Sequence, residues 1–97
     1  MIIVAGSFGV RDDAREDAQA ALLEMQATSR AEGGCHAYAF SWDMEDPNLV
    51  RLYEEWETDE ALQAHAASDH MASFLRATGA MMDGAADFRR FVNAEPA

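Results

Sequence analysis

Residues 35–42 read Cys-His-Ala-Tyr-Ala-Phe-Ser-Trp, and this stretch decides the fold. In an extended strand the side chains alternate between two faces, so the bulky Tyr38, Phe40 and Trp42 share one face. His36 falls on the same face by this alternation. The other face carries small side chains, namely Cys35, Ala37, Ala39 and Ser41. Because neither face is plainly polar, the strand is predicted to lie in a sheet that is covered on both sides. One layer of helices in so short a chain covers one side, so a second copy of the protein is expected on the other.

The segment before this strand predicts a strand and then a helix. A β-prone run covers residues 2–8. Asp13 and Glu16 have the spacing of a capping box at the start of a helix, and the Gly33-Gly34 pair is expected to end it. Apolar residues recur at helical intervals, which predicts one face lying on a sheet: Ala14, Ala18, Ala21, Leu22 and Met25.

The segment after it predicts a hairpin. A polar turn with Pro47 leads into a strand over residues 49–57. One face of that strand carries Val50, Leu52, Glu54 and Trp56. Thr58 then caps a second helix, and Ser68 is expected to break and restart it.

The restarted helix is predicted to reach Gly84, with Gly79 limiting it, and to be followed by a last strand over residues 88–92. Its inner stripe is expected to contain Met71, Phe74, Leu75, Met81 and Met82. The resulting β-α-β-β-α-β order is the ferredoxin-like pattern of an α+β fold, with a four-stranded antiparallel sheet and helices on one face. Residues 1–97 are expected to form a single domain.

Charge and apolar content narrow the classes of partner. The 97 residues include 18 acidic and 7 basic side chains, for a net charge of −11, which disfavours nucleic acids and anionic membranes. No apolar run approaches the roughly 20 residues that span a bilayer, and the N-terminus lacks the basic lead-in of a signal peptide. We therefore expect a cytoplasmic protein. Cys35 is the only cysteine and is interpreted as a small buried hydrophobe.

Three motifs resemble one known family. Residues 33–38 are similar to the "PGC-x-x-Y" opening of strand two in the antibiotic biosynthesis monooxygenase family. Residues 53–62 resemble its "YE-x-W-x-D-x-E-A-L" segment, and residues 65–71 its "H-x-x-S-x-H" continuation. The resemblance implies a dimeric α+β barrel with a ligand pocket between sheet and helices in each subunit. It also implies cofactor-free oxygenation of quinols or polycyclic phenols.

Haem-degrading relatives differ from this chain at informative positions. They place a tryptophan where this chain has His65, and an axial histidine where it has Leu75. They also carry an asparagine in the first strand, and residues 2–8 contain none. The comparison argues against haem degradation and leaves a different haem arrangement open. The resemblance to cofactor-free oxygenases implies no cofactor.

His65 and His70 are the candidate catalytic residues. On one straight helix, side chains five residues apart point roughly 140° apart, but a break at Ser68 would let them converge. A histidine titrates near neutral pH and can take a proton from a phenol, a role we expect for His65. The alternative is a buried core histidine at 65 and a capping or surface histidine at 70. Two histidines without matched carboxylate spacing predict no metal site.

Four further residues are candidates for substrate binding. Trp56 and Phe74 would wall the pocket, and Tyr38 would anchor a substrate oxygen. Each has an alternative role in core or dimer packing. Glu54, a carboxylate among apolar neighbours, needs a partner, for which we expect an arginine across the dimer. Alternatively, Glu54 orients a catalytic histidine or acts as a base.

The sequence therefore predicts a monooxygenase that acts on a small aromatic or quinol-like molecule. A non-catalytic small-molecule-binding or stress-response domain on the same fold is the main alternative. An isomerase or lyase is a third, weaker one.

Overall fold

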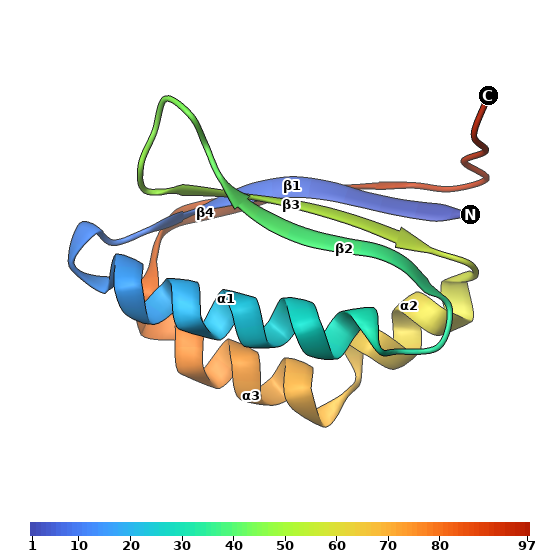
Figure 1. Cartoon of the computed structure of the whole chain (residues 1–97), viewed down its shortest axis with the longest axis horizontal. Helices are drawn as coiled ribbons and strands as arrows, with labels where there is room; N and C mark the ends of the chain where they lie inside the picture. Colours follow the sequence, from blue (N-terminus) through green and yellow to red (C-terminus); the bar gives the residue numbers. More distant parts are fainter.

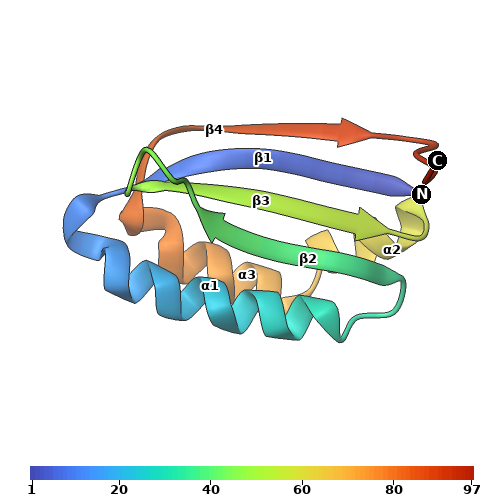
Figure 2. The same ribbon diagram turned by 45° about the horizontal axis from the view of Figure 1, so that its top comes forward.

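The computed structural model describes residues 1–97 and shows one antiparallel sheet with helices packed on one face (Figure 1). The elements follow the chain as β1 (Ile2–Val10), the 3₁₀ turn η1 (Asp12–Ala14), α1 (Arg15–Arg30), β2 (Cys35–Trp42), β3 (Leu49–Trp56), α2 (Asp59–Ala66), α3 (Asp69–Thr78), the 3₁₀ turn η2 (Gly79–Met81) and β4 (Met82–Phe91). The strand order is β2-β3-β1-β4, so β2 and β4 form the two edges (Figure 2). This arrangement confirms the predicted ferredoxin-like α+β fold.

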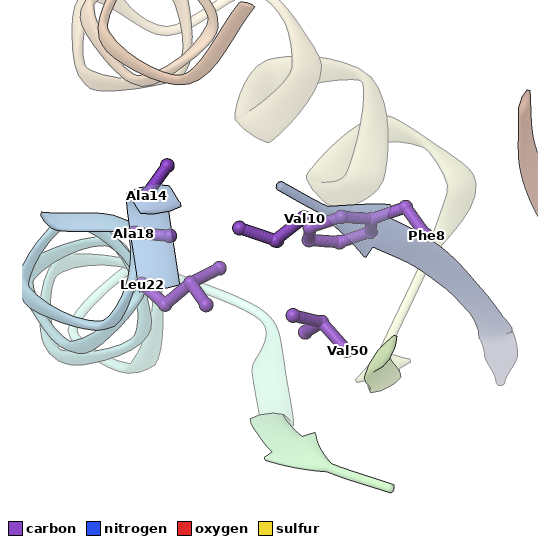
Figure 3. Close-up of a cluster of buried hydrophobic side chains, with 6 residues drawn as sticks. All are labelled: Phe8, Val10, Ala14, Ala18, Leu22 and Val50. Carbon is purple, nitrogen blue, oxygen red and sulfur yellow. The ribbon is translucent and has the colours of Figure 1, made fainter. Parts of the chain in front are cut away.

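The core lies between the sheet and the helices and has two parts. In the first, the helical stripe of α1 meets β1 and β3 (Figure 3), through Phe8, Val10, Ala14, Ala18, Leu22 and Val50. The second contains Ile2, Met25, Tyr38, Leu52 and Trp56. The face of β3 that was predicted to carry Val50, Leu52, Glu54 and Trp56 is buried at all four positions.

The start of α1 differs from the prediction. No capping box forms between Asp13 and Glu16, because Asp13 lies in η1 and the α-helix begins only at Arg15. Asp13 accepts a hydrogen bond from the Arg11 side chain at 3.0 Å instead. The acidic first turn still places negative charge at the positive end of the helix.

The last strand is longer than predicted, and the helix before it is shorter. α3 ends at Thr78, and β4 already begins at Met82 instead of residue 88. β4 pairs with β1 from Val10 opposite Met82 to Ile3 opposite Phe91, with a bulge on the way. Pairing of Met82 and Asp83 with the free edge of β1 thus starts the strand early, and residues 84–86, which have low strand propensity, form the bulge.

Three side chains take a different face from the one predicted. A bulge in β2 between Cys35 and Ala37 places Cys35 opposite Trp56, where it packs on the buried cluster. His36 is exposed and no longer shares the face of Tyr38. On α3, Leu75 is 59% exposed, because the inner face of that helix is formed by its neighbours Phe74 and Met71.

None of the helices combines the length and the apolar character that a membrane-crossing helix requires.

Candidate functional site

The break between α2 and α3 brings the two histidines together. Ser68 caps α3 by accepting a hydrogen bond from the Met71 amide at 3.2 Å, and its hydroxyl donates to the His65 carbonyl at 2.7 Å. The ring centroids of His65 and His70 lie 5.9 Å apart. The predicted convergence is therefore confirmed, and local capping is its cause.

Glu32 joins the two histidines, and sequence reasoning missed it. Its Oε1 lies 2.7 Å from His65 Nδ1 and 2.6 Å from His70 Nε2. Glu32 occupies the loop between α1 and β2, directly before Gly33, where the backbone is held by Cys35 N–H donating to the Glu32 carbonyl at 3.3 Å. The sequence does show a carboxylate directly before the Gly-Gly pair. No local pattern, however, links Glu32 to His65 and His70, which lie 33 and 38 positions further along the chain.

The site runs from the core to the surface. The side chain of His65 is 2% exposed, that of Glu32 18% and that of His70 28%. His65 Nδ1 and His70 Nε2 both face one oxygen of a carboxylate, so each is assigned as an N–H donor to it. This assignment leaves His65 Nε2 and His70 Nδ1 as the basic nitrogens.

His65 is enclosed by aromatic rings. Its ring centroid lies 4.7 Å from that of Trp56 and 5.3 Å from that of Tyr38. Nε2 is buried without a hydrogen-bond partner, 4.0 Å from Glu54 Oε1. His65 is therefore buried, as the alternative role in the core requires, but only its Nδ1 is hydrogen-bonded and its Nε2 is not.

Glu54 is buried on the helix-facing side of the sheet. Its partner is the Trp56 indole, whose Nε1–H donates to Glu54 Oε1 at 2.7 Å. Because this side faces away from the open face of the sheet, the expected arginine across a dimer is not its partner. Burial raises the pKa of the Glu54 carboxyl, and Glu32 adds to this rise, whereas the Trp56 hydrogen bond and His65 oppose it.

The ring of Tyr38 packs against the ring of His65, and Tyr38 is 2% exposed. Burial, helped by the Glu54 carboxylate, raises the pKa of its hydroxyl, so the phenol stays protonated at neutral pH. Its edge-to-face contacts with Phe40 and Trp56 make it part of the aromatic wall around His65.

A cleft of about 250 Å³ opens between α1 and α3 beside this cluster. Its lining consists of Ala21, Glu24, Met25, Thr28, His70, Ser73, Phe74 and Ala77. Phe74 is held by stacking on Phe40, with ring centroids 6.0 Å apart. Of the six predicted site residues, His70 and Phe74 line the cleft. The other four form a buried cluster behind it (Tyr38, Glu54, Trp56 and His65), and Glu32 connects the two groups.

Comparison with known protein families gives one match. The family model described as antibiotic biosynthesis monooxygenase matches residues 1–77. Rv0793 of Mycobacterium tuberculosis, provisionally named a monooxygenase, is 31% identical over 81 residues, which cover 84% of this chain and 79% of that protein. The uncharacterised protein sll1783 of Synechocystis is 28% identical over 94 residues, which cover 97% of this chain. The match spans 64% of sll1783, just under two thirds of its length.

Solved structures show the same fold. The structure of Rv0793 superposes with a TM-score of 0.89 at 25% identity, over 99% of this chain and 97% of that one. A structure from Deinococcus radiodurans reaches a TM-score of 0.92 at 19% identity, over 100% of this chain and 96% of that one. At that identity the Deinococcus match speaks for the fold alone.

Proposed function

Because this chain belongs to the antibiotic biosynthesis monooxygenase family, we propose that it is a monooxygenase that oxidises a small quinol or polycyclic phenol with O₂ and without a cofactor. One observation carries the proposal: His70, hydrogen-bonded through Nε2 to Glu32, lines a cleft of about 250 Å³ walled by Phe74. A cleft of this size lies just below the range of about 300–1,000 Å³ typical of ligand pockets, so it suits a small ligand.

His70 acts as the base in this proposal. With Nε2–H donating to the Glu32 carboxylate, Nδ1 is free to accept a proton from a phenolic hydroxyl. The carboxylate stabilises the imidazolium that forms, in the way a buried acid supports a catalytic histidine. His65 holds Glu32 in place through Nδ1 and so becomes a positioning residue, since it is 2% exposed and is not among the residues that line this cleft.

The substrate supplies the electrons. A phenolate transfers electrons to O₂ far more readily than a phenol does, so proton removal starts the reaction. A phenol with a free para C–H then takes up one oxygen atom of O₂ to become a quinone, and the second atom leaves as water with the two hydrogens. Phe74 and Met25 would keep water from the anion, as apolar pocket walls do.

Oxygen uptake tests this function directly. The chelator-treated protein is mixed with a panel of quinols and polycyclic phenols, and O₂ consumption is followed above the spontaneous rate. We expect uptake with at least one compound and a loss of about 100-fold or more in H70A, the usual range for a general base. H36A, which changes the exposed third histidine, should keep the full rate.

Two results would contradict this assignment. Full activity in H70A would remove the histidine from the mechanism. Binding of the same compounds without O₂ consumption would favour the non-catalytic binding domain.

The exposed face of the sheet supports a second proposal, that two chains pair through it. A shallow hollow on this face is lined by small side chains and by Arg51, Tyr53, Asp87 and Arg89. Basic and acidic groups thus stand on one face, which suits a two-fold interface where the same surface meets itself.

A further inference from the structure

The cluster that joins the histidines has the donor set of a metal site. We propose that Glu32, His65 and His70 bind one Zn²⁺ ion in each chain. Their ligand atoms, one oxygen and two ring nitrogens, all lie within 4.8 Å of one another. Two histidines and one glutamate form the set found in open zinc sites, where water takes the fourth position.

The distances allow an ion after a small movement. Ligands about 2.0–2.2 Å from a tetrahedral zinc are separated by roughly 3.3 Å. Glu32 Oε1 is now 2.7 and 2.6 Å from the two nitrogens, so it must retreat by roughly half an ångström. Glu32 lies in a loop and its side chain has rotatable bonds, so its retreat needs no movement of a helix or strand. The two ring nitrogens, which lie within 4.8 Å of each other, must reach the same separation of roughly 3.3 Å through rotation of the partly exposed His70 side chain.

The unpartnered nitrogen of His65 is an independent observation that favours the metal. In the metal-free cluster the Nδ1 proton faces Glu32, and Nε2 is left as a buried lone pair without a donor. Zinc on Nδ1 would move the proton to Nε2, where Glu54 Oε1 lies 4.0 Å away. Histidine ligands of zinc usually donate their other N–H to a carboxylate, and Glu54 would have to come roughly 1 Å closer to accept this hydrogen bond. This would give the buried Glu54 a second role, besides accepting the hydrogen bond from Trp56.

Zinc at this site would act as an inhibitor of the proposed oxygenase. An ion on His70 Nε2 puts the remaining ring proton on Nδ1, which then cannot accept the proton of a phenol. This consequence rests on the proposed function, whereas the site itself does not.

Calorimetric titration of the chelator-treated full chain with ZnCl₂ tests the site. We expect one ion per chain, with affinity reduced more than about 100-fold in E32Q and in H70A, and 10- to 100-fold in E54Q, the range for a carboxylate that supports a ligand. H36A is the matched control and should bind as the parent does. Circular dichroism of each variant separates loss of a ligand from loss of the fold.

The ring protons of His65 give a second readout. Long-range ¹H–¹⁵N NMR spectra should show the proton on Nδ1 without metal and on Nε2 with zinc. The proposal is overturned if no binding occurs up to about 0.1 mM zinc, a free energy near −5 kcal/mol. It is equally overturned if E32Q binds as tightly as the parent, or if the His65 proton does not move. Neither measurement needs turnover, so failure to oxidise any quinol leaves the zinc result interpretable.

Discussion

At the scale of single residues, Glu54 and Trp56 show how a buried charge is tolerated. The carboxylate has one strong partner, the indole N–H at 2.7 Å, in surroundings that disfavour ionisation. Burial raises the pKa of Glu54, so the folded state holds the proton more tightly than the unfolded chain, whose pKa is near the ordinary 4.5. The free energy of unfolding must therefore fall as the pH rises between these two pKa values.

E54Q removes this titration and keeps the acceptor for the indole. We expect E54Q to be more stable than the parent at pH 8, because glutamine has neither a proton to take up nor a charge to bury on folding. The difference should vanish below pH 4.5, where the carboxyl is protonated in both states. Urea unfolding of metal-free protein at the two pH values measures it.

W56F is the companion variant, since it removes the hydrogen bond that lowers the pKa of Glu54. It should cost about 1–3 kcal/mol for the unpaired acceptor, with a larger loss at pH 8 than at pH 4. Equal losses at both pH values would show that Glu54 does not titrate as argued.

The parts of the candidate site that depend on local sequence patterns could be predicted, and the parts that depend on tertiary packing could not. Convergence of His65 and His70 followed from the cap at Ser68, because a hydroxyl that accepts from the Met71 amide restarts a helix in a new direction. Glu32 was missed because its role depends on where α1 ends relative to α2, which no local pattern specifies. The direction of the Glu54 carboxylate, toward the indole, depended likewise on packing.

At the scale of elements, the junction between α1 and β2 decides where Glu32 lies. Gly34 has a φ of +80°, which side-chain-bearing residues rarely adopt, and an added Cβ would lie 2.7 Å from the Ala61 Cβ of α2. The carbonyl of Gly34 also accepts from the Glu57 amide at 2.8 Å. The loop, the end of β3 and the start of α2 are thus locked together at one glycine.

G34A and G33A form a matched pair that tests this lock. G34A should cost about 1–3 kcal/mol, from the unfavourable φ and the contact with Ala61. Gly33 has no positive φ and nothing within 4 Å of an added Cβ, so G33A should change stability by less than about 0.5 kcal/mol. Urea unfolding of the two variants measures both changes in stability. Equal effects would refute the proposed role of Gly34 in fixing this junction.

The elements themselves were predicted unevenly. β2 was predicted with its observed bounds and β3 to within one residue, since alternating large side chains specify strands directly. β4 was recognised only in its second half, because its first half pairs with β1 only at Met82 and Asp83 and then bulges over residues 84–86, which have no strand propensity of their own. A strand that forms mainly through pairing with a neighbouring strand is hard to predict from its residue types.

At the scale of the whole molecule, the two sides of the sheet have different roles. Helices cover one side, and the other carries the hollow lined by Arg51, Tyr53 and Arg89. The β2 edge is protected, because Gln26 Oε1 accepts from the Phe40 amide at 2.8 Å and the Arg30 side chain donates to the Tyr38 carbonyl at 2.7 Å. The β2 edge is therefore less available to a partner than the open face of the sheet.

A39R tests whether a second copy occupies that face. Ala39 lies opposite Tyr53 on the open side, and a large charge there would prevent two faces from meeting at close range. Light scattering after gel filtration should give a dimer for the parent and a monomer for A39R. A27R, the same change at an exposed position of α1, should remain dimeric. A parent that is monomeric at micromolar concentration in both low and high salt would refute the pairing.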